Sequence, residues 1–409
     1  MKKIKLPFYY LLLIFSTVFV LNSCDNKDPD PVKPANEFLI SNEVKATITG
    51  QQAIDNFTRL SPESSVGISL LIRSDVEVQS IIYKTTFQNQ KIQASGLVCL
   101  PKTAGNYPIL SFQNGTNTLH SLAPTEAVND DLYSIIESIA SMGFIVVVPD
   151  YIGFGASAQL AHPYLDAKSS TQSILDMIRA TKELGSDDLV VSKPTKDLFI
   201  FGYSQGGWAT LALQKEIETN YATEFNLKAS SCGAGPYSIE YLNSSILSRP
   251  EYPTPYFIAY VLNSYKAIGS ITNPLSDFFN EPYASKIPGL FDGNHTGGAI
   301  NTELTSDLNE LFTAEYRTNY EANTKFSGLK SVFTANSIVA WNISTPTKLF
   351  HGEADEVIPF PMSQKMLADF KTKGVPDSKI ELIKITGADH TSGVYPTGLQ
   401  TILWFIGLK

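Results

Sequence analysis

A serine flanked by glycines is the residue of this chain best suited to act as a nucleophile. The run Gly202-Tyr203-Ser204-Gln205-Gly206 has the pattern G-x-S-x-G. Small residues at its two ends let the backbone turn tightly and expose the serine Oγ. An apolar run at 198–201 precedes the pattern and a helical pattern at 208–218 follows it. A serine at the start of a helix can attack a carbonyl carbon, because the helix N-terminus favours the negative charge that develops.

Predicted strands and helices alternate around this serine. Two strands, 76–87 and 91–100, are joined by a polar turn, and later apolar runs predict strands at 109–112, 144–148, 198–201, 229–232, 347–350 and 380–385. Helical spacing of apolar residues occurs at 132–139, 174–178, 208–218 and 398–406. This order predicts an α/β fold, a mostly parallel central sheet flanked by helices, with the first hairpin as its antiparallel edge.

Five motifs occur in a set order along the chain: SFQNGTN (111–117), PDYIGFGAS (149–157), GYSQGG (202–207), HGEADEVIP (351–359) and GADH (387–390). Together they resemble the α/β-hydrolase superfamily, in particular its secreted lipase and esterase branch. The resemblance covers roughly residues 76–409. It implies that Ser204 is a nucleophile whose acid and histidine partners follow it in the sequence, in that order.

The resemblance points to Asp355 and His390 as those partners. Asp355 follows the predicted strand 347–350 in the pattern H-G-x-x-D-x-x-V/I-P, and His390 follows the predicted strand 380–385 in a polar loop. A buried aspartate would orient the imidazole and stabilise its charged form. Three other acidic residues compete for the acid role: Glu353, Glu356 and Asp389. Four other histidines precede Ser204 or stand in other contexts: His120, His162, His295 and His351.

The expected oxyanion hole combines the backbone N–H of Gln205 with that of Thr116 in the loop 113–117. The family usually has His-Gly where this chain has Asn114-Gly115. We expect Asn114 to stabilise the loop by hydrogen bonding. The alternative is a glycine turn without a catalytic part. Asp150 in the PDYIGFGAS motif is expected to be a hydrogen-bonded structural residue rather than a catalytic acid.

The alternation of strands and helices stops between residues 236 and 344. This segment is rich in Tyr, Phe, Asn and Pro, with helical stretches such as 304–320, and is too long for a loop in a compact domain. We interpret 236–344 as an inserted helical cap. It divides the hydrolase core into 37–235, which includes an N-terminal extension, and 345–409. The cap is expected to shape an apolar acyl pocket, although most of its aromatic residues are expected to be ordinary core.

The first residues of the chain have the pattern of an export signal. Lys2, Lys3 and Lys5 precede an apolar stretch at 6–21, and Leu21-Asn22-Ser23-Cys24 resembles a bacterial lipobox. We therefore predict a signal peptide at 1–23, acylation of Cys24 and a Pro-rich, charged tether at 24–36. The alternative is an uncleaved anchor helix. Acidic residues after Cys24 resemble Bacteroidetes surface-export signals, so we expect lipid anchoring at the outer membrane, with the leaflet left open.

Composition excludes several classes of protein. The 409 residues are 43% hydrophobic and 17% charged, which excludes a wholly disordered chain. The formal net charge of −9 argues against a nucleic-acid partner. Three cysteines exclude a disulfide scaffold, and Cys99 and Cys232 lie in apolar runs, which favours two buried free thiols over a disulfide. No zinc-spaced Cys/His cluster, P-loop or dinucleotide motif is present, so we expect neither a metal nor a cofactor.

The leading functional prediction is a serine hydrolase of carboxylic esters, a lipase-like or carboxylesterase-like enzyme that forms an acyl-Ser204 intermediate. Its substrate would be a small or lipid-like ester. A prolyl-type serine peptidase on the same fold is the second possibility, because Glu240, Glu281 and Glu303 could bind a substrate amine. A surface lipoprotein that binds glycans or partners without catalysis is the third. The intact order of Ser204, Asp355 and His390 argues against it.

Overall fold

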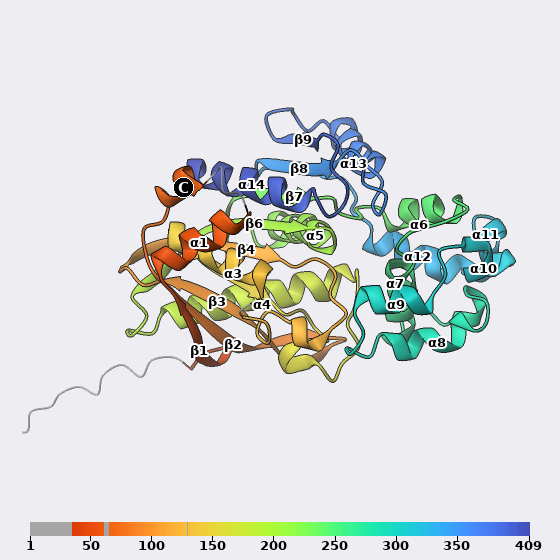
Figure 1. The fold of residues 1–409 in the computed structure, drawn as a ribbon, viewed down its shortest axis with the longest axis horizontal. Coiled ribbons are helices and arrows are strands. Elements are labelled where there is room, and N and C mark those ends of the chain that lie inside the picture. Colours follow the sequence, from red (N-terminus) through yellow and green to blue (C-terminus); the bar gives the residue numbers. More distant parts are fainter. Residues whose placement is uncertain (1–34, 61–64, 129) are drawn as a thin grey trace, which may run out of the picture. The chain divides into compact units, whose positions relative to one another are not determined.

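A nine-stranded sheet forms the centre of the computed structural model, which describes residues 35–60, 65–128 and 130–409 (Figure 1). The predicted signal peptide, Cys24 and nearly all of the tether lie outside these residues. The strand order in the sheet is β1-β2-β3-β5-β4-β6-β7-β8-β9. The strands are β1 Leu39–Ile48, β2 Val76–Phe87, β3 Gln90–Pro101, β4 Gly105–Gln113, β5 Ile145–Pro149, β6 Ser192–Tyr203, β7 Asn226–Gly233, β8 Thr347–Gly352 and β9 Ile380–Ile385.

The strand pairing confirms a mostly parallel α/β sheet. The β1–β2, β2–β3 and β3–β5 pairs are antiparallel, whereas the strands from β5 through β4 to β9 pair in parallel. The prediction that the hairpin of β2 and β3 forms the edge is wrong, because β1 pairs outside β2. Only Leu39 and Ile48 of β1 are buried. An edge strand with so few buried side chains lacks the apolar run that reveals a strand in a sequence.

Helices cover both faces of the sheet. On β5, Ile145 and Val147 belong to one buried cluster and Val146 and Val148 to another, as the alternation of side chains along a strand requires. The first cluster includes residues of α4 and α5, the second residues of α1, α3 and α14. The helices outside the segment between β7 and β8 are α1 Gly50–Leu60, α2 Ser65–Ser69, α3 Asp131–Ser138, α4 Ala167–Gly185, α5 Gln205–Asn220, α13 Pro361–Thr372 and α14 Val394–Leu408.

Short helices occupy the chain between β7 and β8 (Figure 1). The expected helical stretch 304–320 is broken into α10 and α11. Asp307 and Thr313 each accept a backbone N–H through their side chains, so each starts a new helix. We call this part of the chain the helical segment 239–336. Its helices are α6 Ile239–Leu247, α7 Tyr256–Ala267, α8 Tyr283–Leu290, α9 Gly297–Glu303, α10 Leu308–Leu311, α11 Ala314–Asn319 and α12 Ser327–Asn336.

Aromatic side chains form much of the interior of the helical segment. Tyr316 contacts the rings of Phe278, Phe312, Tyr320 and Phe326 at centroid distances of 5.0–5.5 Å. These rings are buried, with at most 2% of each residue exposed. They therefore act as ordinary core, as expected for most aromatic residues of this segment.

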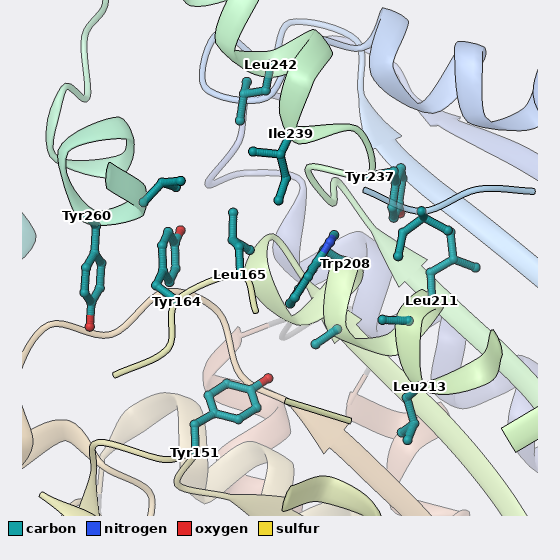
Figure 2. Close-up of a cluster of buried hydrophobic side chains, with 14 of the residues drawn as sticks. Tyr151, Tyr164, Leu165, Trp208, Leu211, Leu213, Tyr237, Ile239, Leu242 and Tyr260 are labelled. Carbon is teal, nitrogen blue, oxygen red and sulfur yellow. The ribbon is translucent and has the colours of Figure 1, made fainter. Parts of the chain in front are cut away.

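The helical segment packs against α5 and the loop that precedes α4. Figure 2 shows Trp208 on α5 in one buried cluster with Ile239 of α6. The Trp208 indole N–H donates to the backbone carbonyl of Asn336 at 2.9 Å. Tyr164 stacks on Tyr260 of α7 with 4.4 Å between ring centroids, and Figure 2 shows both rings. The segment is therefore attached beside α5, the helix that follows Ser204.

A carboxylate of α4 holds the start of β1. Glu183 accepts the backbone N–H groups of Glu37 and Leu39 at 2.8 and 2.7 Å, and that of Phe38 at 3.0 and 3.2 Å. Three consecutive N–H groups at the beginning of the described chain thus find one charged acceptor. Hydrogen bonds to an ionised group are stronger than those between neutral groups.

Both cysteines in the described part of the chain are free and buried, as predicted. Cys99 on β3 and Cys232 on β7 are each 0% exposed. Burial raises the pKa of both thiols, that of Cys232 to about 12. Since the thiolate is the reactive form, both side chains serve as small hydrophobic core groups.

Candidate active site

Ser204 lies in a strained turn between β6 and α5. Its φ of 59° and ψ of −123° are unfavourable for an L-residue. The backbone N–H of Ser204 donates to the carbonyl of Gly233 at 2.8 Å, which helps to hold this conformation. A Cβ on Gly202 would lie 2.3 Å from the Gly206 carbonyl oxygen, and one on Gly206 would lie 1.9 Å from that of Gln113. The turn therefore requires glycine at both ends of the pattern.

Three side chains from distant parts of the sequence form a hydrogen-bonded chain at this turn. His390 Nε2 lies 2.9 Å from Ser204 Oγ, and His390 Nδ1 lies 2.7 Å from Asp355 Oδ2. Asp355 stands in the loop after β8 and His390 in the loop after β9. Because β6, β8 and β9 run parallel, these loops meet at the same edge of the sheet. The three residues singled out in the sequence are thus brought together within hydrogen-bond distance.

Asp355 is buried and fully hydrogen-bonded. Its Oδ1 accepts the backbone N–H groups of Val357 and Ile358 at 2.9 and 2.8 Å, and its side chain is 0% exposed. Burial alone would raise the pKa of this carboxyl. Hydrogen bonds from His351 and His390 outweigh burial and lower the pKa to about 2. Asp355 is therefore an anion at any pH near neutrality.

A second buried histidine supports Asp355. His351 Nε2 lies 2.8 Å from the Ile358 carbonyl oxygen and 3.3 Å from Asp355 Oδ2, so it carries the proton. Its Nδ1 forms a hydrogen bond of 2.6 Å with Ser363 Oγ. The ring is 0% exposed and holds the acid loop in place.

The competing acids have other partners. Glu353 pairs with Lys384 at 2.7 Å, and Glu356 is exposed. Asp389 accepts the backbone N–H groups of Thr391 and Ser392 at 3.0 and 2.7 Å, which shapes the loop around His390. None of these three carboxylates hydrogen-bonds to the imidazole of His390.

Two backbone N–H groups at the site donate no hydrogen bond to any of the described residues. They are the N–H of Gln205, the residue after Ser204, and the N–H of Thr116, which lines the same cavity as Ser204. The preceding Asn114 donates to the Pro149 carbonyl at 2.7 Å, as expected for a loop stabiliser. The Thr116 hydroxyl pairs with the Tyr164 hydroxyl at 2.6 Å. The loop is thus held while its N–H groups stay available to a substrate oxygen.

His162 was set aside in the sequence because it precedes Ser204, yet it contacts the residue after the serine. Its Nδ1 donates to the Ile152 carbonyl at 2.7 Å, which leaves Nε2 to accept the Gln205 side-chain N–H at 3.0 Å. Burial lowers the pKa of His162 to about 4, so the ring stays neutral. No spacing in the sequence reveals this contact, because Gln205 lies 43 positions further along the chain.

Asp150 has the structural role expected of it. It accepts the Ser95 and Thr125 hydroxyls at 2.5 and 2.6 Å and the Thr125 backbone N–H at 2.9 Å. A Cβ on Gly155 would lie 2.1 Å from its Oδ2. Burial raises the pKa of Asp150. The residue ties β3 to the loop after β5 and does not line the cavity at Ser204.

An apolar cavity of about 610 Å³ opens on Ser204 and His390. Gly115 and Thr116 line it near the serine. Most of its walls come from helices on one face of the sheet. They include Phe57 of α1, Ile68 of α2, Ile135 and Ile136 of α3, and Leu399 and Ile402 of α14. From the helical segment 239–336 and its flanks, only Thr254, Tyr256 and Phe257 reach this cavity.

Solved structures of similar fold include a hydrolase, an esterase and a lipase. A putative hydrolase from Legionella pneumophila aligns with a TM-score of 0.81 at 22% identity, over 91% of this chain and 98% of the other. The rice cell wall degrading esterase LipA from Xanthomonas oryzae, in a ligand-bound form, aligns with 0.77 at 22%, over 91% and 97%. Candida antarctica lipase A in its closed state aligns with 0.65 at 20%, over 91% and 82%.

The chain belongs to the secretory lipase family, whose model matches residues 117–407. It is thus a hydrolase that acts on esters, and the family indicates export. No curated protein sequence matches the chain. Within the described residues, no helix is both long and apolar enough to span a membrane.

Proposed function

We propose that this protein is a serine carboxylesterase that works through a Ser204–His390–Asp355 triad. The observation that carries the proposal is the hydrogen-bonded chain from Ser204 Oγ through His390 to Asp355, at the mouth of an apolar cavity. Ser204 Oγ attacks the acyl carbon while His390 Nε2 takes its proton. Asp355, with its low pKa, keeps the Nδ1 proton facing it and stabilises the imidazolium.

The oxyanion of the tetrahedral intermediate is held by the backbone N–H groups of Gln205 and Thr116. Donors that are fixed before the reaction stabilise developing charge without reorganisation. The hydrogen bond from Asn114 to the Pro149 carbonyl fixes the loop of Thr116, and the hydrogen bond between His162 and the Gln205 side chain fixes Gln205. His390 then gives its proton to the leaving alcohol, and later activates the water that releases the acid from Ser204.

The ester interpretation is tested with the purified protein and Ser204→Ala. Hydrolysis of p-nitrophenyl esters from acetate to palmitate, together with labelling by a fluorophosphonate probe, should depend on Ser204. Labelling without turnover of any ester would favour a peptidase. Absence of both in a folded protein would favour a binding lipoprotein. The acidic residues that a peptidase could use have partners elsewhere: Glu240 with Tyr320, Glu281 with Ser285 and Glu303 with Lys286.

The remaining proposals concern organisation and location. We propose that 236–344 is a cap inserted between the core parts 37–235 and 345–409. We also propose that cleavage after residue 23 exposes Cys24 for acylation, which anchors the enzyme at the bacterial outer membrane through the tether 24–36. Detergent phase partitioning tests the anchor. The mature wild type should enter the detergent phase and carry acyl chains on Cys24 in mass spectrometry, and an unmodified Cys24 would contradict the proposal.

A further inference from the structure

Two apolar cavities meet at Ser204, and they differ greatly in size. The large one encloses about 610 Å³ and the small one about 20 Å³. Ser204, Phe257 and Val357 line both cavities. The side chains of Phe257 and Val357 therefore separate the two cavities next to Ser204. A substrate whose carbonyl carbon lies at Ser204 therefore has two directions in which its two halves can extend.

His390 distinguishes the two directions. It lines the large cavity together with Thr391, Val394 and Tyr395 of its own loop and helix, and it does not line the small one. In acylation the bond from Ser204 Oγ to the acyl carbon forms and the bond from that carbon to the alcohol oxygen breaks. The proton taken from Ser204 passes through His390 Nε2 to this leaving oxygen. The alcohol half must therefore extend on the side where His390 lies.

The acyl half is left with the small cavity. Its walls are side chains of the loop before α4 and of α6 and α7, including Leu165, Ile239, Ile246 and Val261. These four are each at most 2% exposed, so they cannot move aside into solvent. A space of about 20 Å³ holds roughly one water-sized group. A methyl group fits, whereas a longer acyl chain would force repacking of a dense interior.

The large cavity suits a long apolar alcohol. Its volume lies within the range of about 300–1,000 Å³ that is usual for ligand sites. The helices α1, α2, α3 and α14 supply mainly Ile, Leu and Phe side chains to its walls. Each methylene group that leaves water for such a surface gains binding free energy.

We propose that this enzyme cleaves short-chain acyl esters, above all acetates, of long apolar alcohols. The small cavity by α6 and α7 holds the acyl group, and the large cavity by α1, α3 and α14 holds the alcohol. This assignment rests on the proposed esterase function. It reverses the arrangement of an enzyme that binds a long acyl chain and releases a small alcohol.

A pair of isomeric esters tests the assignment with the purified wild-type protein. Decyl acetate and ethyl decanoate have the same composition and differ only in which side of the ester carries the long chain. Acid release followed in a pH-stat measures both. We expect kcat/KM for decyl acetate to exceed that for ethyl decanoate by about tenfold or more. Equal values, or a preference for ethyl decanoate, would overturn the proposal.

A variant that fills the large cavity adds a second test. Gly398 of α14 lines this cavity, and a Cβ there would meet only Phe201, at the ordinary contact distance of 3.9 Å. Gly398→Phe should lower kcat/KM for decyl acetate about tenfold more than kcat/KM for methyl acetate. Gly407→Phe is the matched control, because Gly407 is on the same helix, is exposed and does not line the cavity. Equal losses on both acetates in Gly398→Phe would contradict the assignment.

The two proposals can fail separately. If wild-type protein neither reacts with a fluorophosphonate at Ser204 nor hydrolyses methyl acetate, the esterase function itself fails. If it does both but prefers ethyl decanoate, only the assignment of the cavities fails.

Discussion

A buried carboxyl group on α3 gives a quantitative prediction about stability. Glu137 is 1% exposed, and its Oε1 has no hydrogen-bond partner among the described residues. Burial, helped by the nearby charge of Asp130, raises the pKa of Glu137 from 4.5 to about 8. The folded protein therefore holds this group as a neutral acid, whereas the unfolded chain ionises it at a lower pH.

The sign and size of the effect follow from these two pKa values. A group with a raised folded pKa contributes stability that is fully present below 4.5 and is lost as the pH rises towards 8. The loss is about 1.4 kcal/mol per pH unit over this window, or about 3 kcal/mol at pH 7. Glu137→Gln has the same shape but does not titrate. The unfolding free energy of the variant minus that of the wild type should rise by about 2.5 kcal/mol from pH 5 to pH 7, because part of the loss has already occurred at pH 5.

Urea unfolding monitored by tryptophan fluorescence at several pH values measures this difference. The change of this free-energy difference with pH is informative even if the amide of Gln packs less well than the carboxylic acid, because poorer packing lowers the stability of the variant equally at every pH. Glu43→Gln, which changes an exposed carboxyl on β1, should keep the wild-type slope. If the unfolding free energies of Glu137→Gln and the wild type change with pH in parallel, the prediction is refuted. Such a result would show that Glu137 has the same pKa in the folded and the unfolded protein.

Three further predictions concern the site. Asp355→Asn should lower kcat for p-nitrophenyl acetate by about 10⁴-fold, because a neutral amide does not stabilise the charged form of His390. The circular dichroism spectrum should stay unchanged, because the amide oxygen can still accept the two backbone N–H groups. Gly206→Ala should lower the Tm and abolish turnover, because the new methyl would overlap a backbone carbonyl; a folded, active variant would contradict this. Ile246→Ala should enlarge the small cavity and raise kcat/KM for a butanoate ester relative to that for the acetate about tenfold. The loss of buried side chain should lower the unfolding free energy by about 2–4 kcal/mol in urea unfolding. An unchanged butanoate-to-acetate ratio would contradict the assignment of the acyl group to this cavity.

The sequence could predict what depends on local pattern and chain order. Ser204, Asp355 and His390 each follow a recognisable strand, and parallel strands bring the loops that follow them to one edge. The short motif around the serine also predicts its turn, because the glycines are required by contacts within a few residues. These features depend on backbone geometry that the sequence expresses directly.

The parts that could not be predicted depend on contacts between distant residues. The place of β1 in the sheet was left open, within an N-terminal extension, because an exposed edge strand has no apolar alternation. The contact of His162 with Gln205 joins two loops with no spacing rule between them. The large cavity is bounded by Phe57 near one end of the chain and Ile402 near the other, and no local pattern says that α1 and α14 share one face of the sheet.

The Glu183 contact has a mechanical consequence. Under the proposed anchoring at Cys24, any tension between membrane and enzyme enters the described chain just before Glu37. β1 is an antiparallel edge strand, so a pull on its first residue would peel it from β2 one hydrogen bond at a time. The Glu183 carboxylate holds three backbone N–H groups at that end, so peeling the start of β1 must also break a link to α4.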